Sequence, residues 1–207
     1  FKMVNYDYYQ LGIKSVDDRI GGVRKKTLTM LAGKSGTGKT EFTLWMFRSF
    51  NKQNAKVTYF NMELEENMIL RRLRLFPHFS FTKGSNIING RKSYYEVVNY
   101  IRTKKPDIVI IDWLNLMISD EDSGRALVEQ IKIARGLAQL AIDENVAIIL
   151  LNQMNKMGTS AIIDWYAGVA GSSAVYNAAH MFIGLYNRTK ALTPHLMDDS
   201  QLKGIIE

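Results

Sequence analysis

The sequence predicts an α/β fold with a mostly parallel central sheet and helices on both of its faces. Three observations lead to this prediction. Segments of strand length alternate with helical segments along most of the 207 residues, and strands that are separated by helices favour parallel pairing. Residues 108–111 and 146–151 are unbroken apolar runs, which suit strands covered on both sides. A glycine-rich segment at 33–38 joins the first expected strand to the first expected helix.

Five segments are expected to be strands because they are short, apolar and rich in β-branched and aromatic residues. These segments are 27–32, 56–61, 107–112, 146–151 and 181–185. Residues 76–92 and 188–203 are the least regular parts of the chain and are not assigned to any element.

Four segments are expected to be helices: 40–50, 65–75, 93–104 and 123–144. The last is the longest, and its apolar residues recur at alternating steps of four and three, which places them on one face. Asp122 or Ser123 is expected to cap it, because a side-chain oxygen there accepts a hydrogen bond from an orphan backbone N–H group. Pro106 ends the third helix, since proline disfavours its continuation.

The composition is close to a globular average, with 46% hydrophobic and 23% charged residues, and excludes disordered and fibrous classes. No apolar run approaches the roughly 20 residues that a membrane helix needs, and no signal peptide opens the chain. The sequence has no cysteine and only three histidines, which excludes disulfides and argues against a metal cage. We therefore expect an intracellular protein, and we expect a piece of a longer chain because the sequence begins with Phe1.

The net charge of +7 is compatible with a polyanionic partner but does not require one. The basic residues cluster at 24–26, 71–74, 91–92 and 102–105. Such clusters are as often solvated helix ends and turns, so charge alone leaves both interpretations open.

The strongest functional signal is a complete match to the pattern G-x-x-x-x-G-K-[ST] between an expected strand and an expected helix. Glycines let such a loop curl until its backbone N–H groups converge on phosphate oxygens, and the helix start adds a favourable dipole. Lys39 is expected to reach the β- and γ-phosphates, and the hydroxyl of Thr40 is expected to bind Mg²⁺. The segment therefore predicts binding of a nucleoside triphosphate. The expected nucleotide-binding residues are Gly33, Lys34, Ser35, Gly36, Thr37, Gly38, Lys39, Thr40 and Glu41.

Carboxylates at two strand ends are the candidate metal ligand and catalytic base. Asp112 closes the third strand, where a P-loop protein needs a carboxylate beside Mg²⁺. Trp113 follows it and cannot act as a base, so a water-activating carboxylate has to come from another segment. Glu63 is our candidate because it follows the second strand at the carboxyl edge, where α/β sheets bind ligands. Glu65 and Glu66 compete with it, although they look like first-turn acids of the next helix.

Gln153 follows the fourth strand and is expected at the same edge of the sheet. A glutamine there can sense the γ-phosphate through hydrogen bonds and pass the signal to the loop behind it. The alternative is a polar residue that only terminates a strand.

Taken in order, these motifs make residues 10–188 similar to the RecA-like motor domain of hexameric replicative helicases of the DnaB type. The resemblance rests on the glycine-rich loop, on FNMEL around Glu63, on IIDWLNLM around Asp112 and on LLNQMNK around Gln153. The glutamate after the second strand together with the glutamine of the fourth is more specific than the glycine-rich loop, which many families share.

Further segments support the resemblance, and two features depart from it: the residues after the Gly-Ser segment, and the family's arginine finger, which is expected beyond the end of this sequence at Glu207. The lead-in at 11–22, the long helix after the third strand and the Gly-Ser segment at 171–174 are similar to family segments. Asn177 and His180 stand where the family usually has acidic residues.

The resemblance implies a RecA-like P-loop NTPase core and a single ATPase domain over residues 1–207, as a fragment of a longer helicase whose C-terminal strands are missing. It implies a motor that couples ATP hydrolysis at subunit interfaces to translocation on single-stranded DNA, with ATP and Mg²⁺ as cofactors. The implied partners are further copies in a ring, six in number, and a primase or loader, without a membrane. The implied location is the cytoplasm of a bacterial cell or a phage-infected host.

The resemblance also places DNA contacts in the loops after the third and fourth strands, here 114–122 and 154–170. The first loop carries three acidic residues at 120–122 that would repel DNA, so we favour the second. Its small polar side chains and its lysine suit a phosphate backbone. The family's arginine finger lies beyond Arg188 and Lys190, and we assign neither as the finger. The candidate DNA-binding residues are Asn155, Lys156, Gly158, Thr159 and Ser160.

Two other functions remain open at this point. One is a RecA-like recombinase or recombination mediator that forms filaments on single-stranded DNA. The other is a regulatory RecA-like ATPase that binds a protein partner and no DNA.

Overall fold

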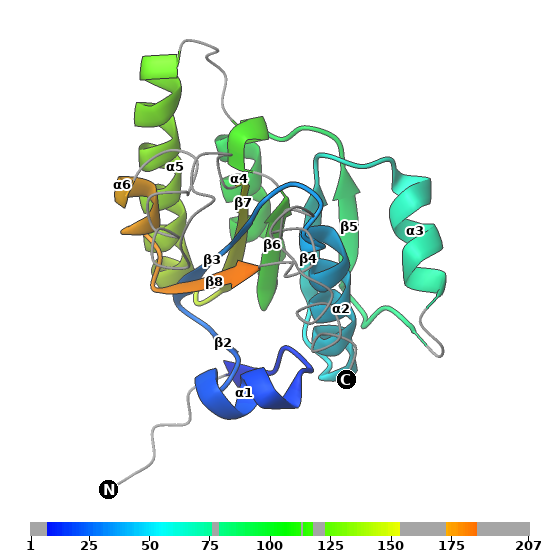
Figure 1. The fold of residues 1–207 in the computed structure, drawn as a ribbon. Helices are drawn as coiled ribbons and strands as arrows, with labels where there is room; N and C mark the ends of the chain where they lie inside the picture. Colours follow the sequence, from blue (N-terminus) through cyan, green and yellow to red (C-terminus); the bar gives the residue numbers. More distant parts are fainter. Residues whose placement is uncertain (1–7, 76–78, 113, 118–122, 154–172, 186–207) are drawn as a thin grey trace, which may run out of the picture.

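Six parallel strands form a central sheet in the order β5-β4-β6-β7-β3-β8 (Figure 1). The computed structural model describes residues 8–75, 79–112, 114–117, 123–153 and 173–185. The parallel sheet confirms the predicted fold class. Its strands are β3 Thr27–Gly33, β4 Val57–Asn61, β5 Asn86–Asn89, β6 Ile108–Asp112, β7 Ala147–Gln153 and β8 Met181–Leu185.

Helices cover both faces of this sheet, as predicted (Figure 1). Helices α2 and α3 pack on one face, and α4, α5 and α6 pack on the other. Among these helices, none combines the length and the apolar character that crossing a membrane requires. The helical elements of the sheet domain are α2 Lys39–Lys52, α3 Glu66–Arg74, α4 Tyr94–Lys104, the 3-10 turn η1 Leu114–Met117, α5 Ser123–Asp143 and α6 Ser173–Tyr176.

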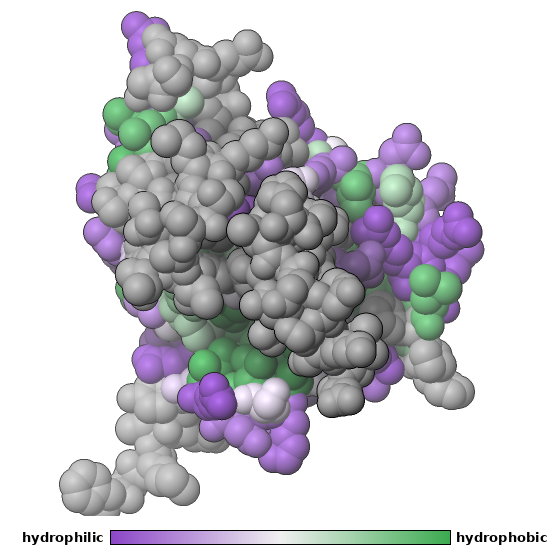
Figure 2. Space-filling view, viewed as in Figure 1, coloured by the Kyte–Doolittle hydropathy of each residue, from purple (hydrophilic) through white to green (hydrophobic). Residues whose placement is uncertain are grey.

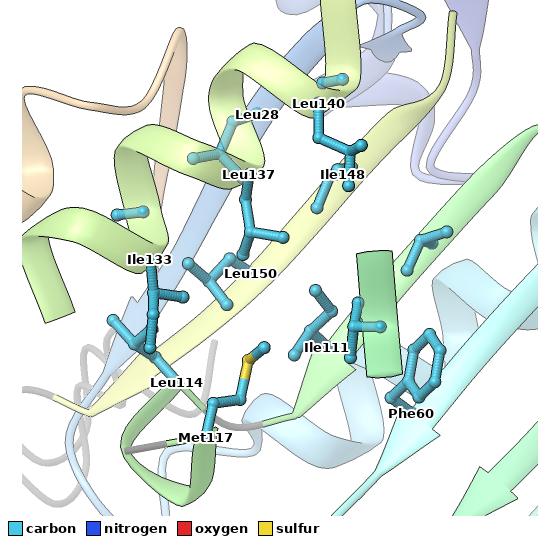
Figure 3. Close-up of a cluster of buried hydrophobic side chains, with 14 of the residues drawn as sticks. Leu28, Phe60, Ile111, Leu114, Met117, Ile133, Leu137, Leu140, Ile148 and Leu150 are labelled. Carbon is cyan, nitrogen blue, oxygen red and sulfur yellow. The ribbon is translucent and has the colours of Figure 1, made fainter. Parts of the chain in front are cut away.

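Alternating strand residues divide the apolar interior into two layers. In β6, Val109 and Ile111 belong to the layer beneath α4 and α5, and Ile108 belongs to the layer beneath α2 and α3. Leu137 and Leu140 of α5 lie over β7 in the close-up of the first layer (Figure 3). Burying one such side chain contributes roughly 1.5–3 kcal/mol, so the two layers supply the main driving force for this fold.

Helix α3 shows how one element is divided between core and solvent. Ile69 and Leu73 are buried against the sheet, while three arginines occupy the last turn of the helix. The surface over α3 is mainly hydrophilic with scattered apolar side chains (Figure 2). Met68 and Leu75 are two of the exposed apolar residues.

The helices and strands at 27–75, 93–153 and 181–185 agree with the sequence predictions to within about two residues at each end. The assignment of 76–92 as irregular is wrong in part, because β5 lies there and forms an edge of the sheet. Four residues are too few to show a periodicity, and pairing with β4 decides the strand. Residues 188–203 lie outside the described part of the chain.

The N-terminal elements have no counterpart in the sequence predictions. Strands β1 Tyr8–Tyr9 and β2 Val23–Arg24 pair antiparallel, and helix α1 Lys14–Ile20 lies between them in the chain. The Asp17 carboxylate accepts hydrogen bonds from the backbone N–H groups of Leu11, Gly12 and Ile13 at 2.7–3.0 Å. The sequence predictions used the spacing of apolar residues, and hydrogen bonds from one polar side chain to nearby backbone groups do not appear in that spacing.

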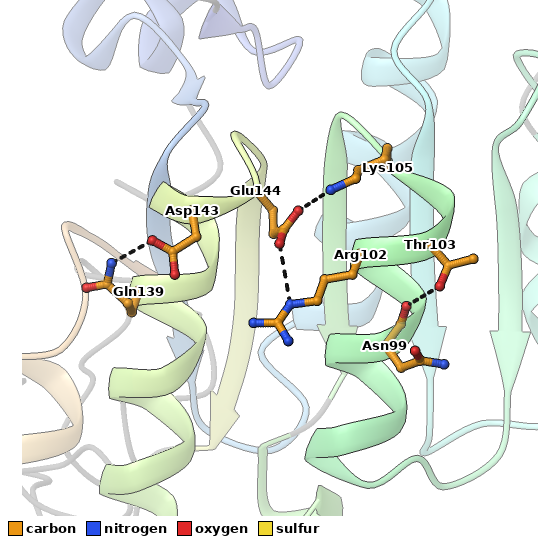
Figure 4. Close-up of polar contacts among 7 residues, drawn as sticks. All are labelled: Asn99, Arg102, Thr103, Lys105, Gln139, Asp143 and Glu144. Carbon is orange, nitrogen blue, oxygen red and sulfur yellow. Dashed lines mark hydrogen bonds and ion pairs between the residues drawn. The ribbon is translucent and has the colours of Figure 1, made fainter.

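Ion pairs tie the elements together at the amino edge of the sheet. Lys25 Nζ lies 2.7 Å from Asp107 Oδ1, and the backbone N–H of Lys56 donates to Asp107 Oδ2 at 2.9 Å. Glu144, after α5, contacts both Arg102 and Lys105 at the end of α4 (Figure 4). These contacts join the start of β3 to β6 and the end of α4 to the end of α5.

Asp107 makes the stability of this edge dependent on pH. Burial favours the neutral carboxyl, but the hydrogen bonds from Lys25 and Lys56 outweigh it and hold the pKa of Asp107 below its ordinary value. A carboxyl whose pKa is depressed on folding stabilises the protein above its unfolded pKa, and this stabilisation is lost as pH falls through the folded pKa.

We predict that Asp107→Asn lowers the free energy of unfolding by about 1–2 kcal/mol at pH 7, because charge-assisted hydrogen bonds are lost. The difference from the parent should shrink as pH falls below about 4, the ordinary pKa of an aspartate, and should disappear as pH passes below the depressed pKa of folded Asp107. Urea unfolding between pH 3 and 7 measures it. Asp143→Asn is the control, because Asp143 is exposed and bonds to the neutral Gln139 in Figure 4. An equal loss in both variants would contradict the prediction.

Candidate active site

The glycine-rich loop turns sharply at the carboxyl end of β3. Gly33 pairs in register with Gln153 of β7 and with Leu185 of β8. A Cβ on Gly33 would lie 2.7 Å from Thr37 Oγ1 and 2.9 Å from Leu185 O, so only glycine fits between strand and loop. Thr37 closes the turn by donating its N–H and its hydroxyl to Lys34 O at 3.3 and 2.8 Å.

Positive φ angles are needed where the loop leads into α2. Gly36 has a φ of 74° and Gly38 a φ of 90°, and side chains with a Cβ rarely adopt this region. Gly38 caps α2, and its carbonyl accepts the N–H of Phe42 at 2.9 Å. The first turn of α2 is thereby held beneath the loop, where its free N–H groups suit an anion.

The ammonium group of Lys39 lies against the loop. Its Nζ donates to Gly33 O at 2.8 Å and to Lys34 O at 3.0 Å. Burial lowers the pKa of Lys39, while the charges of Glu63 and Asp112 act in the opposite direction. The three predicted charged groups therefore lie close enough to influence one another, although they come from three different strand ends.

Asp112 is a carboxylate buried at the end of the central strand β6, with 2% of its surface exposed. Tyr59 Oη donates a hydrogen bond to Asp112 Oδ2 at 2.7 Å. Burial raises the pKa of Asp112 to about 6; the hydrogen bond from Tyr59 opposes this rise, Glu63 adds to it, and Lys39 opposes it. A cation beside Asp112 would remove the cost of this buried charge.

Glu63 is held next to Asp112 by backbone contacts. Asn61 pairs in register with Asp112, and the N–H of Met62 donates to Asp112 O at 2.9 Å. The backbone pairing of β4 with β6 therefore extends one residue beyond Asn61, to Met62. Glu63 then leaves the sheet edge with an exposed side chain. The electrostatic influence of Glu63 on both Lys39 and Asp112 favours it over its two competitors.

The two competing glutamates belong to the next helix. Glu65 is the N-cap residue of α3, and Glu66 is its first residue. Neither contributes to the shifted pKa of Lys39 or of Asp112. Their position matches the expected role of acids near a helix N-terminus.

The remaining predicted residues of the loop region are placed as follows. Thr40 lies in the first turn of α2, one residue after Lys39. The next residue, Glu41, forms an ion pair with Arg72 of α3 at 3.0 Å, so its carboxylate is engaged with α3. Gln153 ends β7 beside Gly33 and is partly exposed.

Magnesium fits the donors at this edge better than a metal held by protein ligands alone. No group of three or more His, Cys, Asp or Glu side chains among the described residues is arranged to hold a metal ion. Mg²⁺ commonly takes one or two protein oxygens and completes its shell with water and phosphate oxygens. The hydroxyl of Thr40 and the carboxylate of Asp112 are oxygen donors of this kind.

The candidate DNA-binding residues lie outside the described part of the chain: Asn155, Lys156, Gly158, Thr159 and Ser160. The same holds for Trp113, Arg188 and Lys190. Their predicted roles stay predictions.

His180, one of the two residues that depart from the family pattern after the Gly-Ser segment, has a structural contact. Its Nδ1 accepts the N–H of Leu28 at 3.0 Å, and its own N–H donates to Leu28 O at 2.8 Å. Leu28 lies near the amino end of β3, at the opposite edge from Lys39. This departure therefore leaves the candidate active site intact.

Sequence reasoning missed Tyr59 and Asn61. Tyr59 fits an apolar strand, and nothing in the sequence indicates that it reaches Asp112. Asn61 offered a weak signal in the sequence, because a polar amide ends the strand segment KVTYFN; the structure shows that it has 0% of its surface exposed. Buried polar groups of this kind need hydrogen-bond partners.

Comparisons with solved structures support the fold. The chain is similar to a solved ATPase domain, with a TM-score of 0.73 and 18% identity over 88% of this chain and 77% of that one. It is also similar to a DnaB-like replicative helicase described together with its interactions with primase, with a TM-score of 0.75 and 17% identity over 88% of this chain and 52% of that one.

Sequence comparisons relate the chain to two groups of proteins. Residues 9–96 match the family model of the DnaB-like helicase C terminal domain. RadB of Archaeoglobus fulgidus is 29% identical over 156 residues, which cover 69% of each chain. RadA of Mycobacterium tuberculosis is 26% identical and covers 95% of this chain and 43% of its own. The replicative helicase DnaB of Synechocystis is 28% identical and covers 68% and 20%, so this chain spans less than half of the latter two.

We predict that Tyr59→Phe raises the pKa of Asp112 above its value of about 6, because the hydrogen bond that favours the charged carboxylate is lost. NMR titration of the side-chain carboxyl carbon, without metal or nucleotide, measures the change. Tyr100→Phe is the matched control, since Tyr100 bonds to Asn86. A titration midpoint of Asp112 that is unchanged or lower in Tyr59→Phe would show that this hydrogen bond does not act on the carboxylate.

Proposed function

Because residues 9–96 match the family model of the DnaB-like helicase C terminal domain and the fold is similar to that of a solved ATPase domain and of a DnaB-like replicative helicase, we propose that the chain is an ATP-driven motor that translocates along single-stranded DNA and separates duplex strands. The family match and the fold confirm the resemblance that the sequence predicted. One observation carries the proposal: the carboxyl edge of one parallel sheet brings together the glycine-rich loop with the Lys39 ammonium against it, the buried carboxylate of Asp112, and Glu63 directly after the β4–β6 pairing. A P-loop lysine, a metal-binding carboxylate and a base are the parts that ATP hydrolysis requires.

In this proposal each residue of the candidate active site has one role. Lys39 exchanges its carbonyl partners, Gly33 O and Lys34 O, for the β- and γ-phosphate oxygens of ATP, which carry full negative charge. Thr40 and Asp112 hold Mg²⁺, which when bound neutralises charge on the phosphates. Glu63 orients a water molecule and accepts its proton, and Gln153 senses the γ-phosphate from the neighbouring strand.

The coupling to DNA is the finer part of the proposal. Residues 154–170 follow Gln153 in the sequence, and in the proposal Gln153 passes a change at the γ-phosphate to them. In the proposal, Asn155, Lys156, Gly158, Thr159 and Ser160 contact the phosphate backbone of single-stranded DNA. The active form is a ring of copies, six in number, in the cytoplasm of a bacterial cell or phage-infected host. A primase or loader is its partner, and residues 1–207 form one ATPase domain of a longer helicase.

A recombination ATPase is the second candidate, because the RadA and RadB proteins are as similar in sequence as DnaB is. Electron microscopy with ATP and single-stranded DNA, together with a strand-displacement assay, separates the two. Closed rings that displace a strand support the motor. Filaments without displacement would favour the recombinase.

We predict that Lys39→Ala abolishes ATP binding or turnover, and that Glu63→Gln retains ATP binding but lowers turnover by roughly 10²-fold or more as general-base help is lost. Binding of a fluorescent ATP analogue and steady-state phosphate release measure the two steps. Glu65→Gln is the control and should turn over normally. Normal ATP turnover in Glu63→Gln together with reduced turnover in Glu65→Gln would identify Glu65 as the general base instead.

We predict that Lys156→Ala weakens binding of single-stranded DNA and reduces the slope of log affinity against log salt by nearly one unit, because one phosphate contact is lost. ATP binding should be unchanged. Fluorescence anisotropy between 50 and 300 mM salt (roughly, the range in which such slopes are resolved) measures the slope. Lys104→Ala on the exposed end of α4 is the control. Equal slopes in Lys156→Ala and the parent would exclude Lys156 from the DNA contact.

A further inference from the structure

Three polar residues stand side by side on neighbouring strands at the carboxyl edge of the sheet. Asn61 of β4 pairs in register with Asn89 of β5 on one side and with Asp112 of β6 on the other. Asn61 has 0% of its surface exposed. An amide buried this completely is unfavourable unless its hydrogen-bonding groups are satisfied, so its contacts explain why it is tolerated.

The side-chain amide of Asn61 forms two hydrogen bonds to the turn that follows its own strand. Its Nδ2 donates to Leu64 O at 2.6 Å, and its Oδ1 accepts the N–H of Leu64 at 3.1 Å. Since a backbone N–H can only donate, Oδ1 has to face it, which fixes the orientation of the amide. The turn from Asn61 to Leu64 is therefore closed at both atoms of the Leu64 backbone, with Glu63 inside it.

Asn89 holds this amide from the edge strand. The second hydrogen of Asn61 Nδ2 is donated to Asn89 Oδ1 at 2.7 Å. The N–H of Gly90 also donates to Asn61 O at 3.0 Å, which extends the pairing of β5 and β4 to the end of the turn. On the other side, Met62 is bonded to Asp112 O. Both neighbours of Glu63 are thus held: Met62 bonds directly to β6, and Leu64 bonds to Asn61, whose side-chain amide is bonded to Asn89 of β5.

We propose that Asn61 and Asn89 are positioning residues for Glu63: the Asn89–Asn61–Leu64 hydrogen-bond chain sets the place from which Glu63 meets the water molecule. The inference rests on the proposed role of Glu63 in ATP hydrolysis. A general base has to lie within hydrogen-bond reach of the proton that it accepts, and a displacement of about 1 Å can lower the rate roughly 10²-fold. The edge strand β5 carries no predicted catalytic residue, but through Asn89 it helps to position the catalytic base Glu63.

The same strand provides a matched control. Asn86, at the other end of β5, donates its Nδ2 to Tyr100 Oη at 2.7 Å, on α4 and away from the turn at 61–64. Asn86→Ala and Asn89→Ala each remove one side-chain amide contact from one strand. A role in folding predicts similar effects of the two substitutions, whereas a role in positioning predicts different effects on turnover.

The first test compares these two variants in the full chain under conditions where the parent hydrolyses ATP. Asn89→Ala should lower kcat by roughly 10- to 100-fold, with the dissociation constant of the fluorescent ATP analogue unchanged because the glycine-rich loop is intact. Asn86→Ala should keep kcat near that of the parent. Equal kcat in both variants, or an equal loss in both, would overturn the inference.

A charge-matched pair tests the direction of the hydrogen bond. Asn89→Asp keeps the acceptor oxygen for Asn61 Nδ2 and should retain kcat within a few-fold, whereas Asn61→Asp removes the donor to Leu64 O and to Asn89 and should lower it as Asn89→Ala does. Each substitution adds one carboxylate near Glu63, so a general charge effect would reduce kcat in both. Such a common reduction would contradict the inference. If an alanine variant fails to fold, Asn89→Asp compared with the parent remains the test, because Asn89 is only partly buried whereas Asn61 has 0% of its surface exposed.

A double-variant cycle separates this inference from the proposed function. In the Glu63→Gln background, Asn89→Ala should cause no further loss of kcat, because the residue that it positions is already inactive. Additive losses would mean that Asn89 acts independently of Glu63 and would overturn the inference alone. If the parent chain hydrolyses no ATP, or if Glu63→Gln is fully active, the proposed function fails before the role of Asn89 is reached.

Discussion

The hydrogen bond from Tyr59 to the buried carboxylate of Asp112 is the contact on which the candidate site depends. A carboxylate at this depth is unfavourable when charged, and its pKa of about 6 expresses that cost. Tyr59 and Lys39 lower the cost, and Glu63 increases it. A cation beside Asp112 would favour the charged carboxylate in the same direction as Tyr59 and Lys39 do.

The two edges of the sheet use charge in opposite ways. At the amino edge, charges are paired directly, as in Lys25 with Asp107 and in Glu144 with Arg102 and Lys105, and these pairs hold strands and helices in place. At the carboxyl edge, Lys39 bonds to two backbone carbonyls, and its carboxylate neighbours affect it only through space. The candidate site thus lies at the opposite end of the strands from the ion pairs of Lys25 and Glu144.

Low sequence identity and a shared architecture are compatible here for a physical reason. The fold is shared with a solved ATPase domain and a solved replicative helicase at 17–18% identity and TM-scores of 0.73–0.75. Apolar layers tolerate many combinations of side chains when volume and pattern are kept. The glycine-rich loop has no such freedom, because Gly33 fits against Thr37 and Leu185 only without a side chain.

The sequence by itself determined five of the six strands of the central sheet, the helices α2, α3, α4 and α5, the glycine-rich loop and the two candidate carboxylates Asp112 and Glu63. These features depend on local patterns: periodicity, a contiguous motif, and a polar residue at the end of an apolar strand. It also left Glu65 as a competitor of Glu63, because three glutamates in four residues cannot be ranked without knowing which one faces Lys39.

Only the tertiary structure decided which distant residues meet. Strand β5 is too short to show a period, and it exists because β4 pairs with it. The contacts of Tyr59 with Asp112 and of Asn61 with Asn89 join residues 53 and 28 positions apart in the chain. Hydrogen bonds over such separations are set by strand order and register, and the sequence alone specifies neither, because the same apolar strands fit several neighbours.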